Sequence, residues 1–114
     1  MAEQTETGTD ELTGLVNRSA ALAKVQEAVH SASQEHPLSV ALLDIDRFAA
    51  FDHQHGIEVG DALLEVVARE LRQALGDNAE LARYSRDTFL AIFPDKSADE
   101  AFLNTEKIRA SFDS

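Results

Sequence analysis

The segment 39–46 constrains the fold of this chain most, because an almost unbroken apolar run stops there at two acidic residues that are one residue apart. Such a run predicts a buried central strand of a sheet. Side chains of a strand alternate between its two faces, so we expect Asp44 and Asp46 on one face and Ile45 on the other. Two acids at a strand end are a candidate metal site, and equally they are typical of solvated turn or capping residues.

The composition predicts one globular domain and narrows its partners. The chain has 114 residues, 44% of them apolar, which is enough for a single core. Its 21 acidic and 10 basic residues give a formal charge of −11, which repels nucleic-acid phosphates and anionic lipids. We therefore expect no nucleic-acid partner and no membrane insertion. The absence of cysteine fits a cytoplasmic protein, and the polar start 1–9 predicts a flexible tail or linker rather than a signal peptide.

Apolar residues at steps of three and four predict two long helices. The first covers about 16–33, and the second covers 61–75 with Gly76 as its C-terminal cap. Between the central strand and the second helix, 47–60 predicts a broken helix or loop. The expected core-facing side chains are Val16, Leu22, Val25, Ala28, Val29 and Ala32 in the first helix, and Phe48 and Phe51 in the broken segment.

The C-terminal third predicts a hairpin followed by a last helix. Two strands, 80–84 and 88–93, are separated by a connection of three residues. Ser97 and Glu100 have the spacing of a capping box. The side chains of the last helix expected to face the core are Phe102, Thr105, Ile108 and Phe112.

The predicted element order is α-β-α-β-β-α, an α/β (α+β) arrangement with helices packed on one sheet. A central strand at 40–45 needs neighbours on both sides, and a crossover with one hairpin supplies only one of them. Three sources of the second neighbour stay open. It comes from a second subunit, it comes from a longer parent protein, or the edge stays unpaired and prone to association.

Four short blocks follow one another in a characteristic order: DELTGLVNR at 10–18, LDIDRF at 43–48, Gly56 with Gly60 and Asp61, and RYSRDTF at 83–89. In this order they resemble the GGDEF family, whose domains make cyclic di-GMP from two GTP. The resemblance implies a nucleotide-cyclase or palm-like sheet. It also implies that 10–114 is a truncated GGDEF-like domain, because the last strands of the family have no counterpart before Ser114.

The resemblance also assigns site residues. It implies that a divalent metal, Mg²⁺, is held by Asp44, by the backbone carbonyl of Ile45 and by Asp87. Hard oxygen ligands suit this task because Mg²⁺ must bridge and polarise the triphosphate. The guanine contacts of the family, an Asn and an Asp, fall on Asp52 and Asp61.

The signature hairpin departs from the family pattern at three positions. Ser85 and Arg86 stand where the family has two glycines, which let the backbone approach the nucleotide closely. Thr88 replaces the signature glutamate, so one carboxylate is lost and Asp87 is left as the vestigial catalytic candidate. Asp52 replaces the guanine-reading Asn, and thereby loses an amide donor and gains a charge.

Three further expectations concern individual side chains. We expect Arg86 to lie near Asp44 and Asp87 and to replace the metal charge by an ion pair. We expect Asp52 to be a loop acid and Asp61 a helix cap. The histidines His53 and His55 alternate in a polar segment, which is more typical of unpaired surface residues than of a metal site.

Together these features predict a degenerate, catalytically inactive GGDEF module. It would act in cyclic di-GMP signalling as a regulatory or dimerisation element, or as a weak nucleotide-binding module. Its expected partners are a second copy of itself or a fused or partner signalling domain, with GTP as a candidate ligand and Mg²⁺ as a candidate cofactor. The alternative is an active diguanylate cyclase of which this chain is a fragment.

Overall fold

The computed structural model describes residues 8–113, and their side chains as far as residue 110. Of the expected tail, 1–7 lie outside the described residues, whereas Thr9 forms a β-bridge with Val16. None of the helices in this described part is both long and apolar enough to cross a lipid bilayer. The elements are α2 (Arg18–Ser31), β1 (Leu38–Asp44), α3 (Phe48–His55), α4 (Ile57–Leu75), a 3-10 turn (Gly76–Asn78), β2 (Glu80–Ser85), β3 (Thr88–Pro94) and α5 (Ala98–Asp113).

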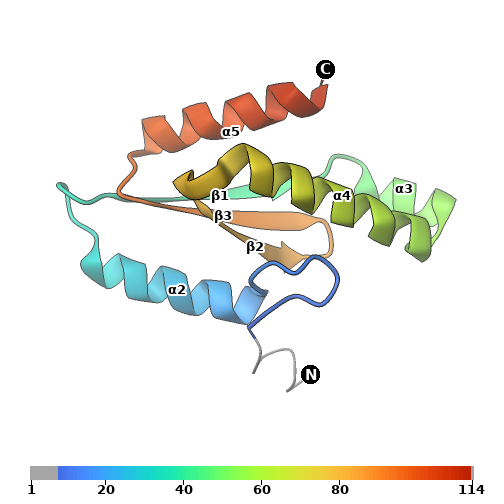
Figure 1. Ribbon diagram of the computed structural model, residues 1–114, viewed down its shortest axis with the longest axis horizontal. Helices are drawn as coiled ribbons and strands as arrows, with labels where there is room; N and C mark the ends of the chain where they lie inside the picture. Colours follow the sequence, from blue (N-terminus) through green and yellow to red (C-terminus); the bar gives the residue numbers. More distant parts are fainter. Residues whose placement is uncertain (1–7, 114) are drawn as a thin grey trace.

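The sheet is antiparallel, with the strand order β1-β3-β2 (Figure 1). The prediction that β1 is the central strand is therefore wrong, because β3 takes that place and is buried from Phe89 to Phe93. Within residues 8–113, β3 is the only strand paired with β1. The side chains of Val40 and Leu42 in this edge strand are 45% and 59% exposed. An apolar run indicates burial but does not identify the strands that will pair with it.

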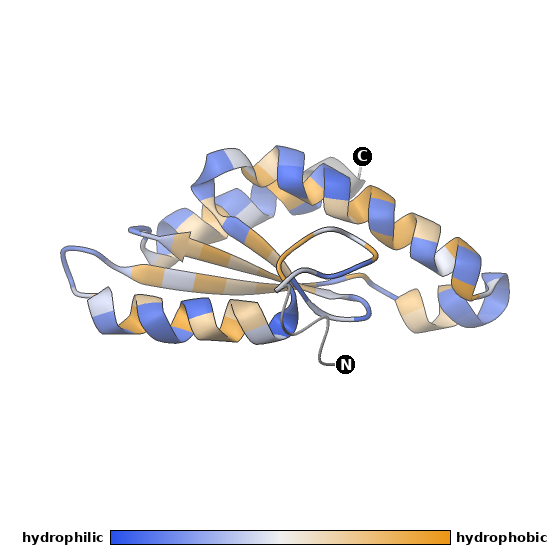
Figure 2. Cartoon of the chain, turned by 60° about the horizontal axis from the view of Figure 1, so that its bottom comes forward, coloured by the Kyte–Doolittle hydropathy of each residue, from blue (hydrophilic) through white to orange (hydrophobic). Residues whose placement is uncertain are grey.

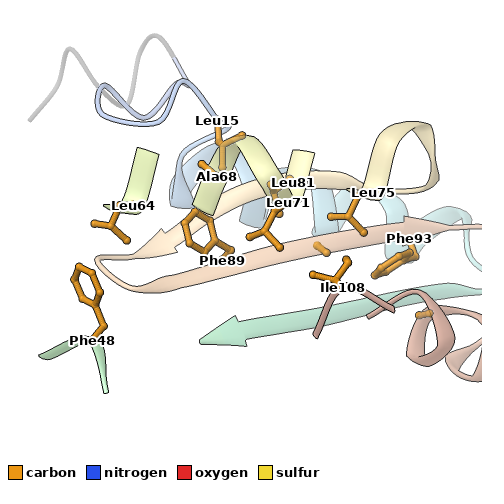
Figure 3. Close-up of a cluster of buried hydrophobic side chains, with 12 residues drawn as sticks. Leu15, Phe48, Leu64, Ala68, Leu71, Leu75, Leu81, Phe89, Phe93 and Ile108 are labelled. Atoms are coloured by element: carbon orange, nitrogen blue, oxygen red, sulfur yellow. The ribbon is translucent and has the colours of Figure 1, made fainter. Parts of the chain in front are cut away.

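Helices cover both faces of this sheet, with α4 and α5 on one face and α2 on the other (Figure 1). In Figure 2 the strands carry much of the apolar colour, while the helices alternate apolar and polar residues. The larger core lies between the sheet and α4 and α5, and Figure 3 shows Phe89, Phe93 and Ile108 within it. A smaller cluster joins Ala21 of α2 to the other face of the sheet.

Local signals placed most helix ends correctly. Gly76 caps α4 with a φ of 53°, and its N–H bonds the carbonyl of Arg72. The capping box is confirmed, since the Ser97 N–H donates to Glu100 Oε1 at 2.9 Å and the Glu100 N–H donates to Ser97 Oγ at 3.2 Å. The broken segment is the short helix α3, which ends at Gly56 with a φ of 93°, and α4 begins directly afterwards, about one turn earlier than predicted.

The predicted inward stripes of two helices are partly wrong. In α2, Leu22 is 45% and Val29 is 57% exposed, and the small Ala21 is buried instead. This follows from the narrow sheet, because α2 packs mainly on β2 and β3 and makes little contact with β1. In α5, Ile108 is buried as predicted but Phe102 is 59% exposed. The expected core contact of Phe112 lies outside the described side chains.

Candidate functional site

The tip of the β2–β3 hairpin brings Arg86 to two helices. Its Nε donates to Asp52 Oδ2 at 2.8 Å, and its Nη2 donates to Asp52 Oδ1 at 2.8 Å. Its Nη1 donates to Asp61 Oδ1 at 2.9 Å. Every nitrogen of the guanidinium therefore has a carboxylate acceptor, and the contact with Asp52 is bidentate, which is a strong and directional way for a carboxylate to bind a guanidinium.

The guanidinium also has an aromatic ring and a glycine beside it. Its Cζ lies 5.5 Å from the centroid of Phe48, a cation–π distance, and Phe48 itself is buried. A Cβ at Gly60 would collide with the Asp52 carboxylate and would approach Arg86 Nη2 within 3.1 Å. Glycine inside a helix costs about 1 kcal/mol relative to alanine, so Gly60 serves the close approach of this ion pair to the α4 backbone.

The charges in this cluster stabilise one another. The hydrogen bonds from Arg86 lower the pKa of Asp52 below its usual range. The hydrogen bonds to Asp52 and Asp61 in turn raise the pKa of Arg86. Both partners therefore stay ionised through the physiological range, and the contact is a permanent ion pair there.

The expected ion pair of Arg86 with Asp44 and Asp87 is wrong in its partners. The hydrogen-bonding acids of Arg86 are Asp52 and Asp61, which lie 34 and 25 residues away in sequence. The predictions that Asp52 is a loop acid and Asp61 a helix cap are wrong. Asp52 lies inside α3, and Asp61 lies inside α4, whose N-cap is Gly56. Arg86 therefore binds the two acids to which the resemblance assigned guanine contact.

The three metal-ligand candidates meet where β1 ends beside the hairpin. The N–H of Ile45 donates to the carbonyl of Asp87 at 3.1 Å, and the register pairs Asp44 with Thr88. The Thr88 hydroxyl donates to Asp44 Oδ1 at 2.6 Å, so part of the donor set is already in use. The Ile45 carbonyl accepts a hydrogen bond from the Phe48 N–H at 3.3 Å.

This corner offers an incomplete donor set for Mg²⁺. Two carboxylates and one carbonyl are fewer than the six oxygens that Mg²⁺ requires, so a fit depends on further oxygens from phosphate or water. Among the described residues no cluster of three or more His, Cys, Asp or Glu side chains is placed to hold a metal ion. His53 and His55 therefore belong to no such cluster. Both are exposed, and the ring centroid of His55 lies 4.5 Å from that of Phe51.

A second arginine, which the sequence analysis did not single out, braces the hairpin. Arg83 Nη1 donates to both carboxylate oxygens of Asp10 at 3.2 Å. Its Nη2 donates to the carbonyl of Arg86 at 3.0 Å, and its Nε donates to that of Ser85 at 3.3 Å. Arg83 thus holds the turn that presents Arg86. Asp10 and Arg83 each belong to one of the four sequence blocks, and this was the signal that could have identified them.

Comparisons with known proteins identify the family of this chain. A family model described as "Diguanylate cyclase, GGDEF domain" matches residues 7–114. The diguanylate cyclase DgcP of Pseudomonas aeruginosa is 33% identical over 104 residues, which are 90% of this chain and 16% of DgcP. The probable diguanylate cyclase DgcF of Escherichia coli K12 is 36% identical over 102 residues, which are 88% of this chain and 31% of DgcF. The chain therefore spans a third or less of each of these two relatives.

Solved structures show the same fold. The FimX GGDEF domain of Pseudomonas aeruginosa superposes with a TM-score of 0.84 at 29% identity, covering 89% of this chain and 63% of the other. The GGDEF domain of DgcB from Caulobacter crescentus, solved with c-di-GMP, gives a TM-score of 0.82 at 31% identity and covers 91% and 61%. With its α+β fold, its four sequence blocks and a family match over nearly its whole length, this chain belongs to the GGDEF domain family.

Proposed function

We propose that this chain is a degenerate, non-catalytic GGDEF module of cyclic di-GMP signalling, whose base-reading site is filled by its own Arg86. The observation that carries the proposal is the set of three hydrogen bonds of 2.8–2.9 Å from Arg86 to Asp52 and Asp61. A guanine base would have to displace a charged side chain from two carboxylates. Binding energy spent on that displacement is lost to nucleotide affinity.

Two other departures support the same proposal. Thr88 stands in place of the signature glutamate, so it supplies no negative charge to a metal ion. Its hydroxyl also donates to Asp44 Oδ1 and thereby occupies one oxygen of a candidate metal ligand. Ser85 and Arg86 place side chains where the family has glycine. Phosphoryl transfer depends on positioning and electrostatic stabilisation, and the two glycines and the glutamate that serve these purposes in the family are absent together.

The proposed role is regulatory. The module would act on a fused or partner signalling domain, or on a second copy of itself as a dimerisation element, in the cytoplasm. Weak nucleotide binding through Asp44, the Ile45 carbonyl and Asp87 remains within this proposal. In that state Mg²⁺, where bound, would neutralise phosphate charge at these oxygens.

A second candidate function is an active diguanylate cyclase of which this chain is a part. It is favoured by the retained corner of Asp44, Ile45 and Asp87, and by relatives that are named diguanylate cyclases. Under this candidate, Asp87 holds the metal without help from a glutamate at position 88. Arg86 would then have to leave Asp52 and Asp61 when GTP binds.

Restoring the signature distinguishes the two candidates. Ser85→Gly, Arg86→Gly and Thr88→Glu would be combined in the longest natural protein that carries this chain. Cyclic di-GMP formation from GTP and Mg²⁺ would then be measured in that variant and in its parent. The non-catalytic proposal predicts no product from the parent. Product from the unaltered parent overturns it.

A further inference from the structure

We infer that Arg86 is an intramolecular latch that closes the hairpin onto α3 and α4, and that the residues around its guanidinium form a socket selective for planar guanidinium groups. The Arg86 socket consists of Asp52, Asp61, Phe48 and Gly60. The inference deepens the proposed function, on which its regulatory meaning rests, by naming the chemistry that holds the site closed. The socket itself is tested independently of catalysis.

The directions of the hydrogen bonds select a guanidinium rather than any cation. Asp52 receives two parallel N–H groups from one edge of the plane, and Asp61 receives a third from the remaining nitrogen. An ammonium group is a point charge with tetrahedral donors and cannot supply two parallel N–H groups to one carboxylate. Lysine in place of Arg86 would keep the charge and lose this fit.

The residues of the socket lie on two helices, so their backbone positions do not depend on the side chain that fills it. Phe48 and Asp52 lie on α3, and Gly60 and Asp61 lie on α4. The side chain of Asp52 is 15% exposed and that of Asp61 is 36% exposed. If Arg86 is truncated, two carboxylates from different helices face each other without a counter-charge in a chain of charge −11. Such an emptied site favours a replacement cation of the same shape.

The turn that carries Arg86 has its own support. Arg83 donates to the carbonyls of Ser85 and Arg86, and it is anchored by Asp10. Truncating the Arg86 side chain leaves these backbone contacts in place. Arg83 is therefore a positioning residue, and the hairpin should stay near the socket after truncation.

The latch is an autoinhibitory contact with a defined release. While Arg86 is seated, Asp52 and Asp61 are unavailable to any other ligand. A competing guanidinium group, or removal of the charge on Asp52, frees the Arg86 side chain from α3 and α4, while Arg83 keeps the turn in place. The ion pair therefore couples the position of the Arg86 side chain to the occupancy of the socket.

Chemical rescue tests the socket. Arg86→Ala would be titrated with methylguanidinium chloride at constant ionic strength, with methylammonium chloride as the matched control, and its thermal midpoint followed. At about five times the dissociation constant we expect methylguanidinium to raise the midpoint by about 4–8 °C. Methylammonium and the unaltered chain should show no such rise. Equal responses to the two salts, or equal responses of variant and parent, would overturn the inference.

Two further variants keep the test decisive. Arg86→Ala combined with Asp52→Asn should lose the rescue by methylguanidinium. Arg109→Ala, which removes the exposed ion pair with Glu106, should not be stabilised by methylguanidinium. If Arg86→Ala does not fold, the Arg86 Nε–H resonance is followed by NMR in the parent and in Asp52→Asn. The latch requires a slowly exchanging Nε–H that becomes fast in Asp52→Asn, and an unchanged exchange rate contradicts it. None of these results depends on cyclic di-GMP formation, so this inference and the proposed function fail separately.

Discussion

Arg83 and Asp10, 73 residues apart, form an ion pair with both carboxylate oxygens 3.2 Å from the arginine Nη1. Their side chains are 12% and 19% exposed, so solvent screens the pair little. Arg83→Met should lower the free energy of unfolding by about 2 kcal/mol, because it leaves a mostly buried carboxylate without its counter-charge and removes the hydrogen bonds of Arg83 to two turn carbonyls. Urea denaturation measures this loss.

The matched control is the ion pair of Lys24 with Glu80. Its side chains are 46% and 44% exposed, and Lys24→Met should therefore cost no more than about 0.5 kcal/mol. Equal losses for the Arg83 and Lys24 variants would show that the Arg83 contacts have no special weight in holding the turn.

Stability should fall on acidification because two carboxyl groups have lowered pKa values. Burial raises the pKa of Asp10, but hydrogen bonds from Thr13 and the charge of Arg83 outweigh the effect of burial, so the pKa is lowered overall. The hydrogen bond from Arg86 lowers the pKa of Asp52. A group whose pKa is lower in the folded state stabilises the fold above its unfolded pKa of about 4, and that stabilisation is lost as the pH falls through the folded value.

The corresponding measurement is the urea midpoint as a function of pH, from neutral to strongly acidic solution. The parent should lose stability below about pH 4. In Asp10→Asn this loss should be smaller, since one of the titrating groups has been removed. A parallel decline in the two proteins would mean that Asp10 does not contribute to the acid transition.

Gly60→Ala tests whether the ion pair needs the glycine. An alanine Cβ would collide with the Asp52 carboxylate, which the bidentate bond to Arg86 holds in place. Alanine otherwise favours a helix by about 1 kcal/mol over glycine. We therefore expect Gly60→Ala to be less favourable in the parent than in an Asp52→Ala background by about 1 kcal/mol or more, measured as a double-mutant cycle. Additive effects of the two substitutions would contradict the close packing.

The capping box at the start of α5 gives a local prediction. Ser97→Ala removes the acceptor of the Glu100 N–H and should cost about 1 kcal/mol of unfolding free energy. Ser31→Ala, an exposed change in the last turn of α2, is the control and should have little effect. A loss at Ser31 as large as that at Ser97 would remove the cap as the explanation.

Features that depend on neighbouring residues could be predicted from the sequence. The Ser97 box, the Gly76 cap and the β2–β3 hairpin each rest on residues a few positions apart. The place of β1 could not be predicted in this way, because its partner β3 lies about fifty residues on and apolar patterning does not name a partner. The exposed Leu22 and Val29 of α2 follow from that same narrow sheet.

The candidate site shows the same division. The resemblance placed Asp44, Asp87 and the altered signature residues in one region, and β1 does meet the hairpin there. The acids that bind Arg86 could not be chosen from the sequence, because a long side chain at a hairpin tip reaches several elements. Geometry alone shows that the changes at positions 52 and 86 belong together as one ion pair.

The most direct test of the central claim is a calorimetric titration of the unaltered chain with GTP and Mg²⁺, followed by analysis of the mixture for cyclic di-GMP. With Arg86 seated on Asp52 and Asp61, we expect no tight, saturable binding and no product. Tight saturable binding with formation of cyclic di-GMP would contradict it.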